Sequence, residues 1–240
     1  MVLAGSRPLI RAELMEAIGE RGVRIDLSSQ APAHLLRHAA FTGLICRGPE
    51  AAGDEPTYVL LDEWVPPAPP LERDEALALF ARRYLEGHGP ASAADFATWS
   101  GLPMPDARAA FALIGDECVE FDAAGTPMVA LASTDLDPPP SPPRLLGRFD
   151  GYLLGYRGRD LILDPRHSRG ILEGGMIQAA VVVGGRIVGT WRLEQRGRMH
   201  ELVVHPFTAL PRGSRGGLRE EAADIGRFLG IEVALVVRDS

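Results

Sequence analysis

Residues 85–96 read Leu85-Glu86-Gly87-His88-Gly89-Pro90-Ala91-Ser92-Ala93-Ala94-Asp95-Phe96. A related stretch lies 82 residues earlier and reads Leu3-Ala4-Gly5-Ser6-Arg7-Pro8-Leu9-Ile10-Arg11-Ala12-Glu13-Leu14. Both stretches have the pattern of a helix end, a Gly-x-x-Pro break and a short second helix. A supersecondary unit repeated at a fixed spacing indicates a duplicated helix-turn-helix.

The first copy predicts two helices followed by a hairpin. We expect a helix over residues 8–19, which Pro8 would start and Gly19 would end. A second helix is expected over residues 33–43, with an apolar side formed by Leu35, Leu36, Ala39, Ala40 and Phe41. Two strands follow, joined by a polar loop, over residues 44–47 and 57–61. This is the element order of a winged helix, and because Met1 falls where the first helix of the unit is due to end, we expect this copy to lack that helix.

The second copy repeats the pattern with its first helix intact. The expected elements are helices over residues 73–88, 92–99 and 106–114 and hairpin strands over residues 118–121 and 128–131. Ser92 is placed to cap the second of these helices. Each copy also has one cysteine at a matched place, Cys46 and Cys118, which we expect to be small buried hydrophobic residues rather than a disulfide or metal pair.

Two proline-rich stretches, residues 65–70 and 137–143, are predicted to be extended linkers. They divide the chain into domains over residues 1–65, 71–136 and 144–240. In the last domain we expect a hairpin of two strands, over residues 178–183 and 186–193, with a Gly184-Gly185 turn. A further strand is expected over residues 199–205, a helix over residues 214–229 and a final strand over residues 231–237. The predicted fold class is α+β, with tandem winged-helix units followed by a β-rich C-terminal lobe with one long helix.

The composition excludes several classes of protein and site. The 240 residues include 25 basic residues and no lysine, so a P-loop lysine and a Schiff-base lysine are excluded. The two cysteines and the absence of a leader segment favour the cytoplasm, with association with the nucleoid as an alternative. The longest apolar stretch, residues 176–183, is too short to span a bilayer, so we expect no membrane contact.

The net charge of −7 is distributed unevenly. Residues 51–140 contain 4 arginines and 16 acidic residues. Residues 1–50 contain 6 arginines and 5 acidic residues, and residues 141–240 contain 15 arginines and 11 acidic residues. Both ends of the chain are therefore compatible with a polyanion as partner, while the acidic middle unit is compatible with a protein partner.

Two groups of residues are predicted to bind double-stranded DNA, including damaged DNA. The first group surrounds the second helix and hairpin of the first copy and consists of His34, Arg37, His38 and Arg47. The second group lies in the C-terminal lobe and consists of Arg192, Arg196, Arg198, Arg212, Arg215 and Arg219. The alternatives are an ordinary solvated face for the first group and, for the last three arginines, a helix start satisfied by Glu220 and Glu221.

The sequence offers little for catalysis. It contains no Gly-x-Ser-x-Gly motif, no glycine-rich phosphate loop and no pair of carboxylates at a spacing typical of a catalytic site. The catalytic residues are therefore unknown, and no cofactor is predicted. His34 and His38 have the spacing of a helical metal-binding pair but lack further ligands, so no metal is predicted. For Asp150 and Asp164 we favour structural roles in capping turns or pairing with arginines over functional ones.

The chain resembles the bacterial winged helix DNA-binding domain family over essentially its whole length. The resemblance rests on the segments Leu60-Leu61-Asp62-Glu63-Trp64, Ala94-Asp95-Phe96-Ala97-Thr98-Trp99-Ser100-Gly101, Leu145-Leu146-Gly147-Arg148-Phe149-Asp150-Gly151-Tyr152, Leu163-Asp164-Pro165 and Gly184-Gly185-Arg186-Ile187-Val188-Gly189-Thr190-Trp191-Arg192. It implies tandem winged helices and a relation to DNA glycosylases that release alkylated or cross-linked bases. Those enzymes carry a Gln-x-Gln motif in an N-terminal region, but the glutamines here are Gln30, Gln178 and Gln195, so no catalytic residue is carried over.

Three functions are compatible with these patterns. We favour a DNA-binding tandem winged-helix protein that acts as a DNA-repair, glycosylase-like scaffold without its catalytic motif. The alternatives are a base-excising DNA glycosylase completed by upstream residues and a non-enzymatic protein-interaction module.

Overall fold

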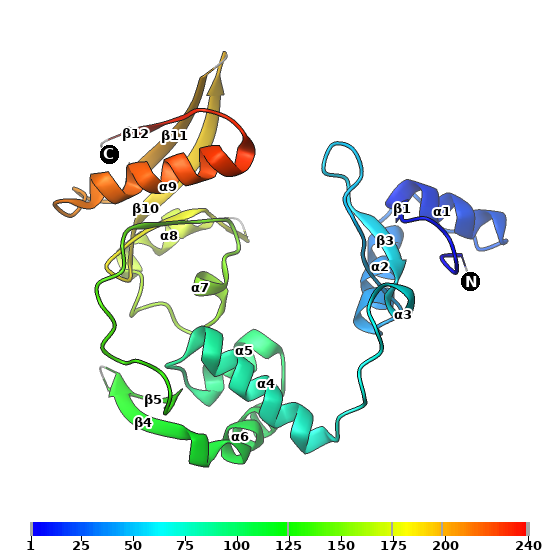
Figure 1. Cartoon of the computed structure of the whole chain (residues 1–240), viewed down its shortest axis with the longest axis horizontal. Helices are drawn as coiled ribbons and strands as arrows, with labels where there is room; N and C mark the ends of the chain where they lie inside the picture. Colours follow the sequence, from blue (N-terminus) through cyan, green and yellow to red (C-terminus); the bar gives the residue numbers. More distant parts are fainter. Residues whose placement is uncertain (1, 124, 174, 198, 239–240) are drawn as a thin grey trace. The chain divides into compact units, whose positions relative to one another are not determined.

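A proline-rich linker separates two compact units, Met1–Pro70 and Leu71–Ser240 (Figure 1). The computed structural model describes residues 2–123, 125–173, 175–197 and 199–238. Within these residues, no helix is long and apolar enough to cross a membrane.

The first unit combines short helices with a three-stranded antiparallel sheet of order β1-β3-β2. Its elements are β1 (Leu9–Ile10), α1 (Arg11–Glu20), α2 (Ala31–Phe41), β2 (Ile45–Arg47), β3 (Thr57–Leu60) and α3 (Leu61–Trp64). A small core holds them together and includes Leu14, Met15, Leu36, Ile45 and Leu60.

The predicted start of the first helix at Pro8 is wrong. Leu9 and Ile10 pair with Tyr58 and Thr57 of β3, so the backbone after Pro8 is extended and α1 begins only at Arg11. This pairing joins residues far apart in the sequence, and a local helix-start signal contains no information about it.

The predicted apolar side of α2 is also partly wrong. Leu36 is buried, but Leu35 is 39% exposed and Phe41 is 84% exposed. Because α2 meets the core of its unit through Pro32 and Leu36, the residues half a turn away around the helix face solvent.

The second unit begins with three helices and a hairpin. These elements are α4 (Arg73–His88), α5 (Ala93–Ser100), α6 (Met104–Leu113), η1 (Gly115–Glu117), β4 (Cys118–Ala123) and β5 (Thr126–Leu131). The predicted cap of α5 is confirmed, because the Ser92 hydroxyl accepts from the Asp95 backbone N–H and the Asp95 carboxylate accepts from the Ser92 N–H. Aromatic side chains fill the core between these helices, with Tyr84 and Phe96 fully buried.

The rest of the second unit is built on a five-stranded sheet of order β12-β11-β10-β9-β6. The elements are β6 (Arg144–Leu146), α7 (Gly151–Leu154), η2 (Pro165–His167), α8 (Ser168–Ile171), β7 (Leu172–Glu173), β8 (Met176–Ile177), β9 (Ala180–Val183), β10 (Arg186–Arg196), β11 (Met199–Pro206), α9 (Ser214–Leu229) and β12 (Val233–Val237). The neighbouring strands are antiparallel except for β11 and β12, which are parallel.

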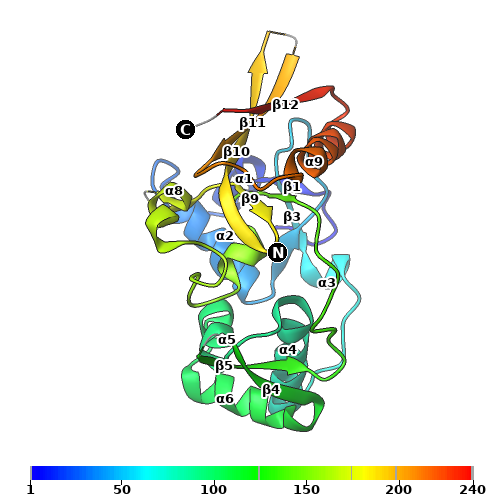
Figure 2. The same cartoon turned by 90° about the vertical axis from the view of Figure 1, so that its left-hand side faces the viewer.

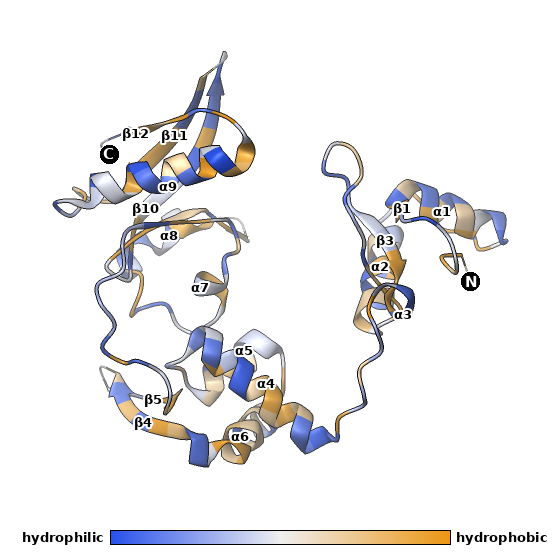
Figure 3. Cartoon of the chain, viewed as in Figure 1, coloured by the Kyte–Doolittle hydropathy of each residue, from blue (hydrophilic) through white to orange (hydrophobic). Residues whose placement is uncertain are grey.

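Helix α9 covers one face of this sheet (Figures 1 and 2). Leu218 and Ala222 of α9 share a buried cluster with Leu202 and Val204 of β11. Hydrophilic and hydrophobic residues are mixed along α9, as expected for a helix with one buried side (Figure 3). The predicted bounds of this helix are confirmed, and so is the Gly184-Gly185 turn, where both glycines have the positive φ that a tight hairpin requires.

The chain is therefore a mixture of helices and mainly antiparallel strands, as predicted. The predicted segments 71–136 and 144–240 both lie within the second compact unit, and their division into separate domains stays a prediction. Cys46 and Cys118 are free, as expected, although both are half-buried rather than buried.

Candidate nucleic-acid interface

The exposed side of α2 presents three of the predicted DNA-binding residues together. His34, Arg37 and His38 are exposed, and their spacing of three and four residues places them on the same side of the helix as Phe41. The Arg37 Nη2 atom lies 2.7 Å from His34 Nδ1, and since a guanidinium can only donate, Nδ1 is the acceptor. We call these four residues the α2 stripe.

Arg47 lies at the end of β2, close to the loop of the hairpin. Its guanidinium lies over the Tyr58 ring of β3, 5.1 Å from the ring centroid, and the side chain is exposed. In the described part of the chain, neither Arg47 nor Arg37 forms an ion pair with a carboxylate. Both positive charges are therefore available to a partner from outside.

The start of α9 brings together three exposed arginines, Arg212, Arg215 and Arg219. The residue before the helix, Gly213, has φ +84° and supplies no side-chain cap, and the first turn contains no acidic residue. Unsatisfied N–H groups and the dipole of a helix start both favour an anion.

The predicted alternative, in which Glu220 and Glu221 satisfy this helix start, is wrong for Glu221. Its carboxylate accepts from Arg144 Nη1 at 2.8 Å and from the Leu145 backbone N–H at 3.0 Å, which ties α9 to β6. Glu220 follows the first turn and is exposed.

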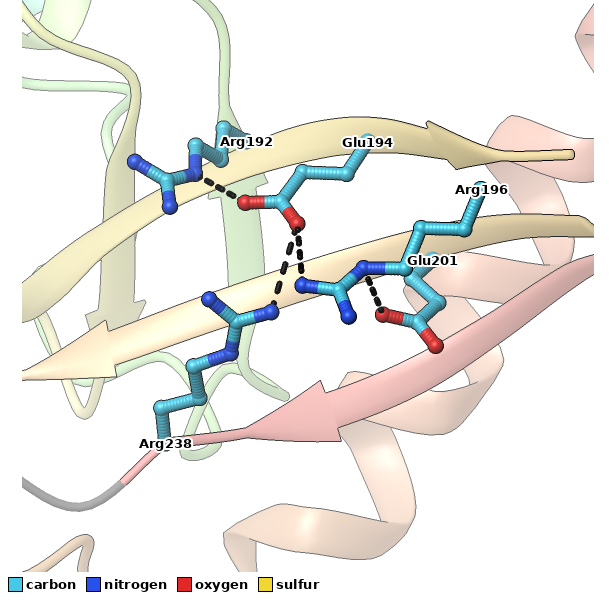
Figure 4. A network of polar contacts seen from close by, with 5 residues as sticks. All are labelled: Arg192, Glu194, Arg196, Glu201 and Arg238. Carbon is cyan, nitrogen blue, oxygen red and sulfur yellow. Dashed lines mark hydrogen bonds and ion pairs between the residues drawn. The ribbon is translucent and has the colours of Figure 1, made fainter.

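The predicted arginines of the β10–β11 hairpin have internal partners that the sequence did not reveal (Figure 4). Arg192 Nε lies 2.5 Å from Glu194 Oε1, and Arg196 Nη2 lies 3.3 Å from Glu194 Oε2. Arg196 Nε also lies 3.3 Å from Glu201 Oε2. Hydrogen bonds from Arg192 and Arg196 lower the pKa of Glu194, so this carboxylate is charged at neutral pH.

Arg238 belongs to the same network and was not predicted. Its Nη2 atom lies 3.2 Å from Glu194 Oε2, and its backbone N–H donates to Val204 of β11. The parallel pairing of β12 with β11 brings this residue beside the hairpin, and no signal in the sequence gives that pairing. Arg198, which was also predicted to bind DNA, lies outside the described residues.

The helix of the second unit that corresponds to α2 is α6, and like α2 it carries one exposed arginine. Arg108 is its one arginine, and Asp106 on the same helix pairs with Arg73 of α4 at 2.8 Å. Arg82 of α4 forms two hydrogen bonds of 2.7 Å to Glu117.

The structure places the candidate polar residues for catalysis in structural contacts. Asp150 accepts from the Tyr152 N–H, and Asp164 accepts from the Arg166 N–H and guanidinium. Both aspartates therefore cap short helices, in agreement with the structural roles that we favoured. Gln195 donates to the Gly197 carbonyl oxygen, 3.1 Å away.

Comparisons with known proteins give a consistent result. Residues 2–228 match the family described as "DNA glycosylase AlkZ-like". An interstrand DNA cross-link repair glycosylase of Streptomyces sahachiroi is 32% identical to this chain over 212 residues, a match that covers 82% of this chain and 55% of that protein. The chain thus spans about half the length of this curated relative.

A solved structure is also similar. The DNA glycosylase AlkZ of Streptomyces sahachiroi superposes on this chain with a TM-score of 0.74 and 29% sequence identity. The superposition covers 97% of this chain and 65% of that chain. The likeness therefore extends over both compact units.

Proposed function

This chain belongs to the AlkZ-like family of DNA glycosylases, and from that membership we propose that it binds duplex DNA in DNA repair. Its first unit and its C-terminal lobe would contact the DNA. The observation that carries this assignment is the α2 stripe together with Arg47, where exposed cationic side chains have no carboxylate partner among the described residues.

The element order supports a winged-helix reading of both repeated units. In the first unit, α1 and α2 precede the β2–β3 hairpin, and in the second, α4, α5 and α6 precede the β4–β5 hairpin. The helix before the hairpin is the one that winged-helix proteins place in the major groove. We assign this role to α2, with residues 48–56 as the wing.

A second contact is assigned to the C-terminal lobe. Arg212, Arg215 and Arg219 surround a helix start without a side-chain cap, an arrangement that suits a backbone phosphate. Arg192 and Arg196 of the hairpin would extend this contact. Phosphate contacts of this kind position a protein on DNA without reading its sequence.

The proposed substrate is damaged duplex DNA, including cross-linked DNA, in keeping with the name of the Streptomyces sahachiroi relative. Residues 1–240 contain no Gln-x-Gln arrangement, so we propose a binding scaffold rather than a complete catalytic site for this segment. The alternative is a base-excising glycosylase in which residues outside this segment complete the site. A base-release assay on alkylated duplex distinguishes the two, because only the second yields free base.

Binding to a short labelled duplex, measured by fluorescence anisotropy over a series of salt concentrations, tests the proposal. Dissociation constants of about 1–100 μM are expected at physiological salt, and the logarithm of the affinity should fall linearly with the logarithm of the salt concentration. Intact, alkylated and cross-linked duplexes are compared at each salt concentration. A protein with no duplex affinity at low salt contradicts the proposal.

A second candidate function is contact with a protein partner through the second unit. It is favoured by the excess of acidic residues over residues 51–140, where two of the four arginines, Arg73 and Arg82, are already paired internally. A partner that binds the second unit while the protein ignores DNA would replace the first proposal with this one.

A further inference from the structure

Glu194 lies at the centre of three arginine side chains on one face of the sheet (Figure 4). Its carboxylate accepts from Arg192 Nε at 2.5 Å, from Arg238 Nη2 at 3.2 Å and from Arg196 Nη2 at 3.3 Å. Two of these arginines come from β10, and the third follows β12. Three guanidinium groups thus converge on one oxyanion.

The strand geometry explains why this cluster is accessible. Side chains alternate between the two faces of a strand, so Arg192, Glu194 and Arg196 share one face of β10. Leu202 of β11 and Trp191 of β10 point to the opposite face and pack against α9. The side chains of Arg192 and Arg196 are 57% and 56% exposed.

The carboxylate lies deeper than the guanidinium groups that surround it. The Glu194 side chain is 20% exposed, and that of Arg238 is 35% exposed. A ligand that approaches from solvent therefore meets the arginines before it meets the glutamate.

The charges facing Glu194 leave a positive excess. Glu201 is the second carboxylate of the network and contacts Arg196. His205 lies near the network. Burial lowers its pKa most, and the charges of Arg192 and Arg238 lower it further, so its imidazole is uncharged at neutral pH. Among the described residues, three arginines therefore face two glutamates.

We propose that Glu194 occupies the place of a DNA backbone phosphate and that a bound duplex displaces its carboxylate from the three arginines. This inference rests on the proposed function. A phosphodiester resembles a carboxylate in carrying one negative charge and two oxygens that accept from guanidinium groups. Because Glu194 already orients the arginines, they lose little side-chain freedom when a phosphate replaces it. Glu194 keeps the site arranged and at the same time competes with the phosphate.

Removing the charge of Glu194 tests this inference. Glu194→Gln keeps the size of the side chain and should tighten duplex binding by about threefold to tenfold at low salt, because the arginines no longer exchange one anion for another. The matched control is Glu232→Gln, which changes the net charge of the same lobe equally at an exposed residue before β12. We expect the control to tighten binding by less than about twofold, since Glu232 has no arginine partner among the described residues and its exposed charge is screened.

A double variant identifies the arginines as the cause. In Glu194→Gln with Arg238→Ala, the gain should be lost, because coupled residues show non-additive effects. Thermal unfolding of every variant is measured alongside, and Glu194→Ser replaces Glu194→Gln if the latter does not fold.

The outcomes separate this inference from the proposed function. If wild-type protein binds duplex and Glu194→Gln binds no better than Glu232→Gln, the inference is wrong and the proposed function stands. If Glu194→Gln binds more weakly, Glu194 only holds the arginines in place and the inference is again wrong. If wild-type protein has no duplex affinity, both are wrong.

Discussion

Helices α2 and α6 occupy the same place before a hairpin in the two repeated units, yet they present different surfaces. The α2 stripe consists of exposed His34, Arg37, His38 and Phe41, without a carboxylate partner among the described residues. On α6, Ala107 and Ala110 are buried, and the acidic residue near its start, Asp106, pairs with Arg73 of α4.

The second repeated unit, residues 71–131, uses its polar groups to join the C-terminal part of the same compact unit. The Tyr84 hydroxyl donates to the Gly155 carbonyl at 2.6 Å, and the Tyr156 hydroxyl donates to the His88 carbonyl at 2.8 Å. The Asp95 carboxylate accepts from the Arg157 backbone N–H at 2.8 Å. The comparison teaches that two units with the same order of elements need not have the same role, because the second is joined by hydrogen bonds to the C-terminal part of the chain.

Asp95→Ala should give the largest effect and tests the packing role of the second unit. Asp95 is 7% exposed and accepts from the Ser92 N–H, the Ser92 hydroxyl and the Arg157 N–H. Its loss leaves partly buried donors without a partner, which should lower the free energy of unfolding by about 2 kcal/mol. Urea unfolding measures this, with Asp116→Ala at an exposed position of the same repeated unit as the control. Equal, small effects of the two substitutions would show that Asp95 does not tie the second unit to the C-terminal part.

Phe41→Ala tests whether the α2 stripe faces DNA. Phe41 is 84% exposed in the α2 stripe, on the same side of the helix as Arg37, where an apolar side chain can contact base edges. Its loss should weaken duplex binding about fivefold, which corresponds to about 1 kcal/mol. The slope of affinity against salt should stay the same, because no phosphate contact is removed.

The control for this variant is Leu35→Ala, a 39% exposed residue on the same helix but outside the stripe. Its affinity should match that of the wild type. If Phe41→Ala also binds as the wild type does, the exposed side of α2 does not meet the bases.

Glu117→Gln should give the smallest effect on duplex affinity, and it tests whether the second repeated unit contacts DNA. It frees the charge of Arg82, yet duplex affinity should change by less than about twofold if the second repeated unit, residues 71–131, lies away from DNA. The hydrogen bond from Arg82 lowers the pKa of Glu117, so the stabilisation by this pair is present above the unfolded pKa and is lost as the pH falls through the folded pKa. Thermal unfolding as a function of pH should show a weaker acid dependence in the variant. A clear gain in duplex affinity would instead place Arg82 at the DNA.

The sequence predicted the elements whose signals are local. The bounds of α9 and α4 and the turn at Gly184 and Gly185 follow from helical periodicity and from the φ requirement of glycine. Strand β1 was missed because it depends on pairing with β3, nearly fifty residues away.

The residues of the candidate interface stay a prediction, and the structure adds contacts of theirs that the sequence did not reveal. Periodicity placed Phe41 on an apolar side of α2, but it does not say which apolar residues the rest of the unit covers. Arg192 and Arg196 were identified by their charge, whereas their pairing with Glu194 and Arg238 depends on strand register and on the parallel pairing of β12. Register is set by tertiary packing, so composition and charge counts did not contain it.

The most direct test compares Arg37→Glu on α2 with Arg108→Glu on α6, two equal charge reversals in the two repeated units. Duplex affinity is measured for both variants and the wild type over the same salt series. Arg37→Glu should lower affinity about tenfold at low salt and flatten the salt dependence by about one phosphate contact, while Arg108→Glu should leave both within about twofold of the wild type. Equal losses in the two variants, or a larger loss for Arg108→Glu, would contradict the division of roles between the two units.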